Sequence, residues 1–181
     1  MAQWLIDPAH SEIKFKVKHL VVSSVTGRFT RFNGTVQAEK ADFSDAKIQF
    51  EADVDSINTS NEQRDGHLKS PDFFDAAGFP KLSFQSTSIT KKSGDAYVLT
   101  GDMTMKGTKQ SISLDMSYNG TAKGFDGDVA GFEITGKLNR QEFGLRWNVL
   151  TETGGVVVSD EVKLDIAVEL KRAAVEVVVA A

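Results

Sequence analysis

The sequence predicts an all-β fold in which about eight antiparallel strands form one sheet and a single short helix lies near residues 60–70. Apolar and charged side chains alternate in short runs, which predicts strands, and turn signals containing glycine or asparagine separate these runs. A break in this pattern at residues 60–70 predicts the helix. Short connections favour hairpins over the long crossovers of a parallel sheet, so the sheet is expected to be antiparallel.

The clearest strand covers residues 12–19. Its side chains alternate between apolar and charged from Ile13 until His19, as expected of a strand with one face in water. Further strands are expected around residues 29–36, 48–54, 82–84, 97–99, 112–118, 132–138 and 162–170. On this register, one apolar row points inward and lines a single cavity, formed by Phe15, Val17, Phe50, Phe84, Met116, Phe132 and Ile134, while Lys16, Glu51 and Glu133 face water.

Turn signals separate these runs. They fall at Asn33-Gly34, Ser93-Gly94-Asp95, Asn119-Gly120, residues 124–128 and Gly154-Gly155. Glycine and asparagine adopt the backbone conformations that tight hairpins require, so each signal predicts a hairpin or loop.

Residues 60–70 carry the signals of a short helix. Ser60 is a candidate N-cap with Gln63 three residues later, and Pro71 follows the expected end. Gly66 weakens the helix by roughly 1 kcal/mol relative to alanine, so packing against the sheet must support it. The expected anchors are Leu68, Phe73 and Phe74.

Length and composition fit one domain, since the chain has 181 residues and 40% are hydrophobic. We expect this domain to cover residues 1–172, followed by a tail of unknown structure at 173–181 that is rich in alanine and valine. The net charge of -4 comes without a basic run, so no nucleic-acid partner is expected. The chain has no cysteine, which excludes disulfides and thiolate metal sites.

The chain carries no signal-like or membrane-spanning segment. Its start lacks a basic and then apolar stretch, so a cytoplasmic location is expected, or a periplasmic or secreted one if a signal peptide has been removed. The longest apolar stretch, at the end of the chain, is far shorter than the roughly 20 residues of a spanning helix.

Alternation alone does not choose between a sandwich with a filled core and a barrel that holds a ligand. The chain has 12 phenylalanines against 2 tyrosines, and methionines occupy inward registers at Met103 or Met105 and at Met116. Phenylalanine and methionine form smooth, adaptable apolar walls. Composition by itself nevertheless favours the filled core over the cavity.

Local motifs along nearly the whole chain decide in favour of the barrel. Arg64-Asp65-Gly66-His67-Leu68, Asp72-Phe73-Phe74 and the pair Arg140 with Phe143-Gly144 stand in an order and spacing similar to those of the YceI-like family. Further matching segments lie at residues 7–11, 15–20, 25–29, 32–34, 56–59, 79–80, 84–86, 101–104 and 107–108. The resemblance implies a lipocalin-like barrel whose apolar pore accepts a polyisoprenoid, a quinone tail or a similar amphiphile, with no other cofactor.

The expected function is therefore to bind such a lipid for carriage, storage or sequestration. The residues expected to contact it are Phe15, Val17, His19, Phe29, Phe50, Val54, Leu68, Phe73, Phe74, Phe84, Met103, Leu114, Met116, Phe132, Ile134, Leu138, Phe143, Trp147, Leu164 and Ile166. Arg64, Asp65 and His67 are expected to hold the helix as a lid over one barrel end. Being adjacent, Arg64 and Asp65 should bind separate backbone groups. A transient membrane contact and a homodimer remain open.

Other functions have weaker support. His19 lies on the inward register and could meet a lipid head group, or it could be a neutral core histidine. Together with Arg64, Asp65 and His67 it could instead serve an enzyme acting on a small lipid or hydrophobic substrate. The three histidines fit no zinc spacing, and no serine stands in a nucleophile elbow, so neither a metal nor a catalytic residue is predicted. A protective scaffold with a filled core is the third alternative.

Overall fold

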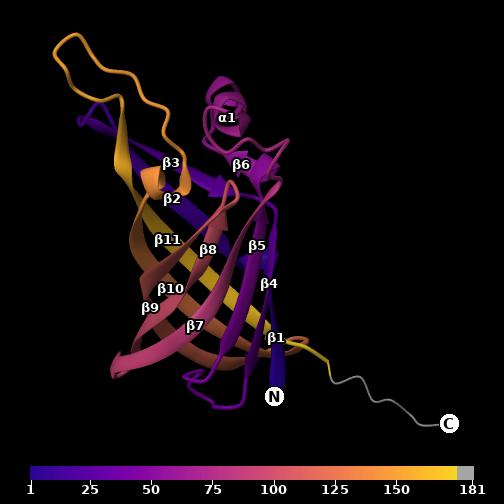
Figure 1. Ribbon diagram of the computed structural model, residues 1–181. Coiled ribbons are helices and arrows are strands. Elements are labelled where there is room, and N and C mark those ends of the chain that lie inside the picture. Colours follow the sequence, from indigo (N-terminus) through magenta and orange to yellow (C-terminus); the bar gives the residue numbers. More distant parts are fainter. Residues whose placement is uncertain (175–181) are drawn as a thin grey trace.

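The computed structural model describes residues 1–174 and has the expected architecture, a closed barrel of eight antiparallel strands with one short α-helix at one end (Figure 1). Most of the predicted tail, residues 175–181, lies outside the described residues. The ring closes where the first strand pairs with the last. Its order is β1 (Ala2–Ile6), β4 (Phe32–Ala38), β5 (Lys47–Asp53), β7 (Lys81–Ser93), β8 (Ala96–Met105), β9 (Thr108–Gly124), β10 (Gly127–Asn139) and β11 (Val158–Arg172).

At two places in the barrel wall, a short non-strand segment separates one strand from a second strand that continues it. After β1, the short 3-10 helix η1 (Pro8–His10) redirects the chain into β2 (Glu12–His19), and both strands pair with β11. In the same way β3 (Ser23–Phe29) continues into β4, and β6 (Ile57–Asn58) pairs with the end of β3. The hairpin of β2 and β3 therefore extends the barrel wall beyond the ring at the helix end (Figure 1).

Two predicted turns are wrong. Asn33-Gly34 lies inside β4, with Gly34 opposite Phe50, so the strand expected at 29–36 is really two strands joined at Thr30 and Arg31. Asn119-Gly120 lies inside β9, where Gly131 pairs with Gly120 but Phe132 pairs with Tyr118, leaving Asn119 as the extra residue of a bulge. Gly120 has a φ of 110°, so the sequence signal marks a bulge that needs this conformation.

The helix α1 (Glu62–Lys69) forms where it was expected, but its cap differs. Asn61 is the N-cap, and its side-chain oxygen accepts a hydrogen bond from the Arg64 amide at 2.9 Å. The predicted cap, Ser60, has a φ of 61° and precedes the cap. Among residues 1–174, no helix has the length and apolar character needed to cross a membrane.

An aromatic cluster fills the barrel end opposite α1. Phe43 contacts Trp4, Tyr118 and Phe132 with ring centroids 5.1–5.5 Å apart, and Tyr118 also stacks against Phe132. Trp4, Phe43 and Phe132 are each less than a tenth exposed. Aromatic contacts of this kind add to the free energy gained by burial, so this end is closed by packed side chains.

Candidate functional site

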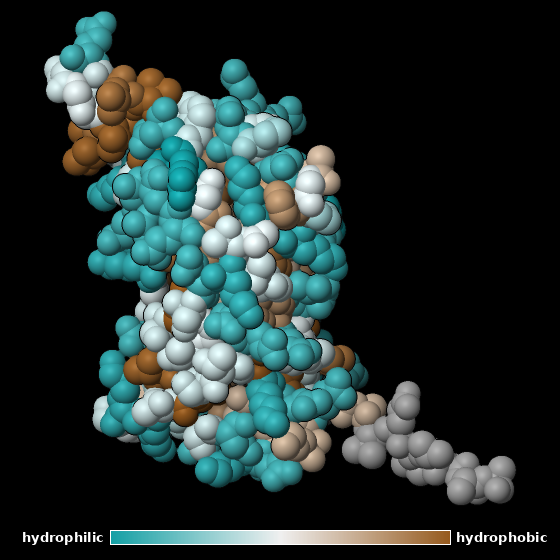
Figure 2. Space-filling model, viewed as in Figure 1, coloured by the Kyte–Doolittle hydropathy of each residue, from teal (hydrophilic) through white to brown (hydrophobic). Residues whose placement is uncertain are grey.

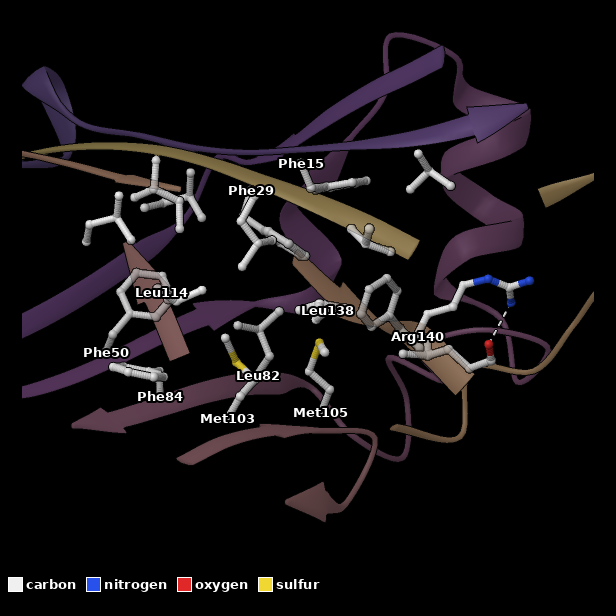
Figure 3. Close-up of a pocket in the computed structure, with 18 of the residues that line it drawn as sticks. Phe15, Phe29, Phe50, Leu82, Phe84, Met103, Met105, Leu114, Leu138 and Arg140 are labelled. Atoms are coloured by element: carbon white, nitrogen blue, oxygen red, sulfur yellow. Dashed lines mark hydrogen bonds between the residues drawn. The ribbon is translucent and has the colours of Figure 1, made fainter. Parts of the chain in front are cut away.

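The barrel interior contains a cavity of about 640 Å³ that is lined by inward-facing side chains from every strand of the ring (Figure 3). Most of its wall is formed by phenylalanine, leucine, isoleucine, valine and methionine. The volume lies within the range of about 300–1,000 Å³ that is usual for small-molecule sites. The interior is therefore a binding space rather than a filled core.

The structure places nearly all of the predicted contact residues around this cavity. They are Phe15, Val17, His19, Phe29, Phe50, Leu68, Phe73, Phe74, Phe84, Met103, Leu114, Met116, Phe132, Ile134, Leu138, Trp147, Leu164 and Ile166. Lys16 and Glu133 are exposed, as the alternation predicts, and Glu51 bonds with Asn33 on the outer face.

Val54 and Phe143 do not line the cavity. Val54 lies in the 3-10 helix η2 (Val54–Ser56) and Phe143 in η3 (Arg140–Phe143), each immediately after a strand ends. Both side chains are almost fully buried in the surrounding core. For Val54, the prediction extended the strand alternation past the end of β5, where a 3-10 helix turns successive side chains by about 120° instead of 180°. Phe143 was assigned from its motif, and its odd number places it off the even-numbered inward register of β10.

Two glycines make room for aromatic rings in the wall. Gly27 faces Phe15 across the β2–β3 ladder, and a Cβ on Gly27 would lie only 2.3 Å from the Phe15 ring. A Cβ on Gly101 would lie 2.4 Å from the ring of Phe84. Because these backbone surfaces carry no side chain, the rings lie against the wall and leave the cavity open.

Polar side chains gather at the α1 end of the cavity. Lys18, Asn61 and Gln63 are exposed there, whereas His19 and Arg64 are half-buried. His19 is only half-buried and does not belong to the cluster of core residues, so the interpretation as a core histidine is wrong. The cavity has an apolar body and a polar mouth, the arrangement that suits an amphiphile with one polar end.

Thr59 fixes the start of α1 through the two motif residues Arg64 and Asp65. Asp65 Oδ1 accepts hydrogen bonds from the Thr59 amide at 2.9 Å and from its hydroxyl, while Arg64 Nη2 donates to the Thr59 carbonyl at 2.8 Å. The two side chains bind separate backbone groups, as predicted, but these groups belong to one residue. Thr59 is 4% exposed, so this junction is shielded from water.

His67 joins α1 to the loop that follows η3. Its ring packs edge-on against Trp147 with centroids 4.7 Å apart and against Phe73 at 5.1 Å. Its Nε2 lies 2.9 Å from a carboxylate oxygen of Asp72. Arg64, Asp65 and His67 therefore all contact neighbouring protein groups that hold the helix in place.

Arg140, like Thr59, is a buried polar residue at the cavity that the sequence interpretation did not assign to the site. Its guanidinium donates to the carbonyl oxygens of Leu145 and Trp147 at the start of a loop, and of Val158 and Ser159 at its end. Burial lowers the pKa of Arg140, and Asp160 at 3.6 Å opposes this shift. Arg140 continues the even-numbered inward register of β10, so alternation past Leu138 could have revealed it.

Three potential metal ligands meet outside the cavity, where η1 contacts β11. Atoms of Asp7, His10 and Glu169 lie within 4.8 Å of one another. The Lys171 ammonium is 2.7 Å from Asp7, so a protein cation already balances this carboxylate. This hydrogen bond and the one from His10 lower the pKa of Asp7 to about 2.

A family model described as the YceI-like domain matches residues 4–170. The chain belongs to the YceI-like family. This YceI-like chain is 39% identical to the UPF0312 protein SA2479 of Staphylococcus aureus (strain N315) over 171 residues, which cover 93% of this chain and 97% of the relative.

Solved structures share the YceI-like barrel. The Campylobacter jejuni YCEI protein is 32% identical, with a TM-score of 0.73 over 87% of this chain and 90% of that one. A domain from Saccharophagus degradans that is described as polyisoprenoid binding has a TM-score of 0.68 over 94% and 98% of the two chains, at 14% identity. The second likeness shows the shared fold alone.

Proposed function

We propose that this YceI-like chain binds one long-chain amphiphilic lipid, of the polyisoprenoid class or a similar one such as a quinone tail, inside the barrel. The observation that carries the proposal is the apolar cavity of about 640 Å³ whose polar side chains lie at one end. The apolar chain of the ligand occupies the barrel body, and its polar end lies near Lys18, His19 and Gln63 at the mouth.

Affinity arithmetic supports a stable complex. A ligand of about 35 heavy atoms gains about 10 kcal/mol at roughly 0.3 kcal/mol per atom, which corresponds to sub-micromolar binding. The proposal names a polyisoprenoid first because the Saccharophagus degradans domain, which has the same fold, is described as polyisoprenoid binding. Carriage, storage and sequestration all use this one binding step.

We favour binding without chemistry over the enzyme alternative. Arg64 and Asp65 are engaged by Thr59, and His67 packs between Phe73 and Trp147. A catalytic acid or base must reach a proton of the substrate. The side chains of Arg64, Asp65 and His67 are instead engaged in contacts within the protein, which favours a structural role for them.

Organic extraction of the protein purified from its own host, followed by mass spectrometry, tests the proposal. We expect about one amphiphile per chain. The matched control is the Ile134→Glu variant, which places a carboxylate in the cavity wall and should carry none. The proposal fails if the native protein repeatedly yields no stoichiometric lipid, or if both proteins yield the same one.

A further inference from the structure

Two exposed apolar loops stand next to each other beside the cavity mouth. One is the turn Leu20–Val22 between β2 and β3, and the other is the loop 144–157 between η3 and β11. The Leu20 amide donates to the Val157 carbonyl at 3.0 Å, which joins the two loops. Figure 2 shows an apolar patch on this protruding corner of the molecule.

Six aliphatic side chains on these loops face solvent. Val21, Val22 and Leu150 are 76%, 85% and 70% exposed, and the others are Leu20, Val149 and Val156. We call these six residues the apolar tip. Scattered exposed apolar residues are ordinary, but a contiguous apolar patch marks a surface that contacts a partner or a membrane.

The backbone of the turn makes this choice of residues unusual. Leu20 and Val21 have φ values of 51° and 64°, in the left-handed region that favours glycine or asparagine. A β-branched residue in this conformation is strained, and strain of this kind concentrates at functional sites. The backbone conformation at Val21 favours glycine or asparagine. Stability of the hairpin therefore does not explain the valine, and we infer that its apolar side chain serves a contact with a partner.

The charge around the tip identifies the partner surface. The β2–β3 hairpin that carries the turn, residues 12–29, contains Lys14, Lys16, Lys18 and Arg28 in a chain whose net charge is -4. Its one acidic residue, Glu12, lies at the end away from the turn and pairs with Lys14. Within residues 1–174, Lys16, Lys18 and Arg28 make no ion pair, and the loop 144–157 is balanced by Arg146 and Glu152. A basic stem beneath an apolar tip is complementary to an anionic lipid surface.

We propose that the apolar tip inserts into the interfacial region of a lipid bilayer that contains anionic lipids, with Lys16 and Lys18 near the head groups. The tip adjoins the cavity mouth, because His19 and Val157 at the bases of the two loops line the cavity. Docking in this way turns the mouth toward the membrane. The inference goes beyond the ligand proposed above and does not depend on it.

A second copy of the chain fits this surface less well. A stable protein interface buries about 20–30 residues on each side and is depleted in lysine, whereas the tip offers six aliphatic side chains on a basic hairpin. A symmetric dimer would place the same basic hairpins opposite each other, and like charges would oppose the contact.

Flotation of lipid-stripped protein with vesicles tests the proposal. The vesicles are phosphatidylcholine alone or phosphatidylcholine with phosphatidylglycerol, and neither contains an isoprenoid. We expect binding to the anionic vesicles that weakens as salt rises. Because each buried aliphatic side chain contributes about tenfold or more to partitioning, Val21→Asn/Leu150→Ser should bind at least about tenfold more weakly.

Matched controls separate docking from general changes. Phe125→Ser removes a fully exposed aromatic ring at the opposite end of the barrel and should leave vesicle binding unchanged. Lys16→Gln/Lys18→Gln should weaken binding to anionic vesicles, whereas Lys40→Gln/Lys47→Gln, with the same change in net charge at the far end, should not. Asparagine suits the left-handed backbone at Val21, so thermal unfolding should show that the double tip variant remains folded.

Three results would overturn the proposal. The first is that the native protein binds neither kind of vesicle. The second is that Phe125→Ser and the tip variant lose vesicle binding equally. The third is that the native protein forms a dimer that is absent in the tip variant, while vesicles are not bound. Extraction of a native ligand tests the proposed lipid binding, whereas flotation of lipid-stripped protein tests membrane docking, so either proposal can fail without the other.

Discussion

Asp65 accepts hydrogen bonds from both the amide and the hydroxyl of Thr59 through a single carboxylate oxygen. This contact spans six residues and ties the first part of α1 to the chain that enters it from β6. Hydrogen bonds to a charged group contribute about 1.5–3 kcal/mol each when shielded from water. The position of α1 over the mouth therefore depends strongly on one side chain.

Replacing Asp65 with alanine should loosen α1 and speed release of a bound lipid by about tenfold, a factor that corresponds to about 1.4 kcal/mol. The barrel should remain folded, because its strand ladders do not include Asp65. Stopped-flow release of a fluorescent isoprenoid measures the rate. Glu62→Ala on the exposed side of the same helix is the control. An unchanged release rate with a globally unfolded barrel would show that the motif stabilises the fold rather than a gate.

Replacing Gly27 with alanine should reduce the cavity without unfolding the protein. The added Cβ would lie 2.3 Å from the Phe15 ring, so the ring must move into the space that the lipid would occupy. We expect lower lipid stoichiometry and a change in unfolding free energy within about 1 kcal/mol. Gly131→Ala is the matched control, because its Cβ would make an ordinary 3.5 Å contact. Equal lipid content in both variants would contradict the proposed path of the ligand.

Replacing Ile134 with glutamate should remove lipid binding more than it reduces stability. A carboxylate in the apolar wall must be desolvated or protonated when a lipid is present, but it can be hydrated in an empty cavity. Thr135→Glu is the control, since Thr135 is the exposed neighbour on the same strand. Binding of a fluorescent isoprenoid and urea unfolding of both variants measure the two effects. Tight binding by folded Ile134→Glu would show that the ligand lies elsewhere.

Replacing Arg140 with methionine should destabilise the loop 144–157 and with it the apolar tip. The substitution removes the guanidinium donor from four carbonyl oxygens, of which the Val158 oxygen still accepts from Asn148 Nδ2, and we expect a loss of about 3 kcal/mol in unfolding free energy. Arg140→Lys keeps the charge but cannot reach both ends of the loop, so it should recover only part of this loss. Hydrogen exchange across residues 144–157 reports the local effect. If the amides of residues 144–157 in Arg140→Met exchanged as slowly as in the native protein, the proposed role of Arg140 in this loop would be contradicted.

Acid should destabilise the protein through Asp7. Its pKa falls from 3.8 to about 2 on folding, mainly because of its hydrogen bonds with Lys171 and His10. A lowered pKa contributes stability that is fully present above pH 3.8 and is lost as the pH falls toward 2. We expect this loss to be about 2 kcal/mol.

Urea unfolding at several pH values measures this contribution. Asp7→Asn should be less stable at neutral pH and should lose less stability on acidification, whereas Asp95→Asn on an exposed turn should follow the native protein. An identical pH dependence in Asp7→Asn and the native protein would show that other carboxylates cause the acid response.

The sequence by itself determined the class of fold and the lining of the cavity. Alternation has a period of two, so the inward faces of β2, β7 and β10 could be predicted wherever the strand was regular. The same reasoning failed at Val54, because this residue lies just past the end of β5 in a 3-10 helix, whereas Phe143 was assigned from its motif and is buried beside the cavity. It also failed at Asn33-Gly34 and Asn119-Gly120, where pairing with neighbouring strands overrode the local turn signal.

Only the tertiary structure decided which distant residues meet. Thr59 gives no sequence signal for its junction with Arg64 and Asp65, and Arg140 bonds to both ends of a loop up to 19 residues away. The two halves of the apolar tip are separated by more than a hundred residues and adjoin because β2 pairs with β11. Periodicity records which face of a strand is buried, whereas barrel closure sets which strand ends become neighbours, and closure depends on pairing across the whole chain.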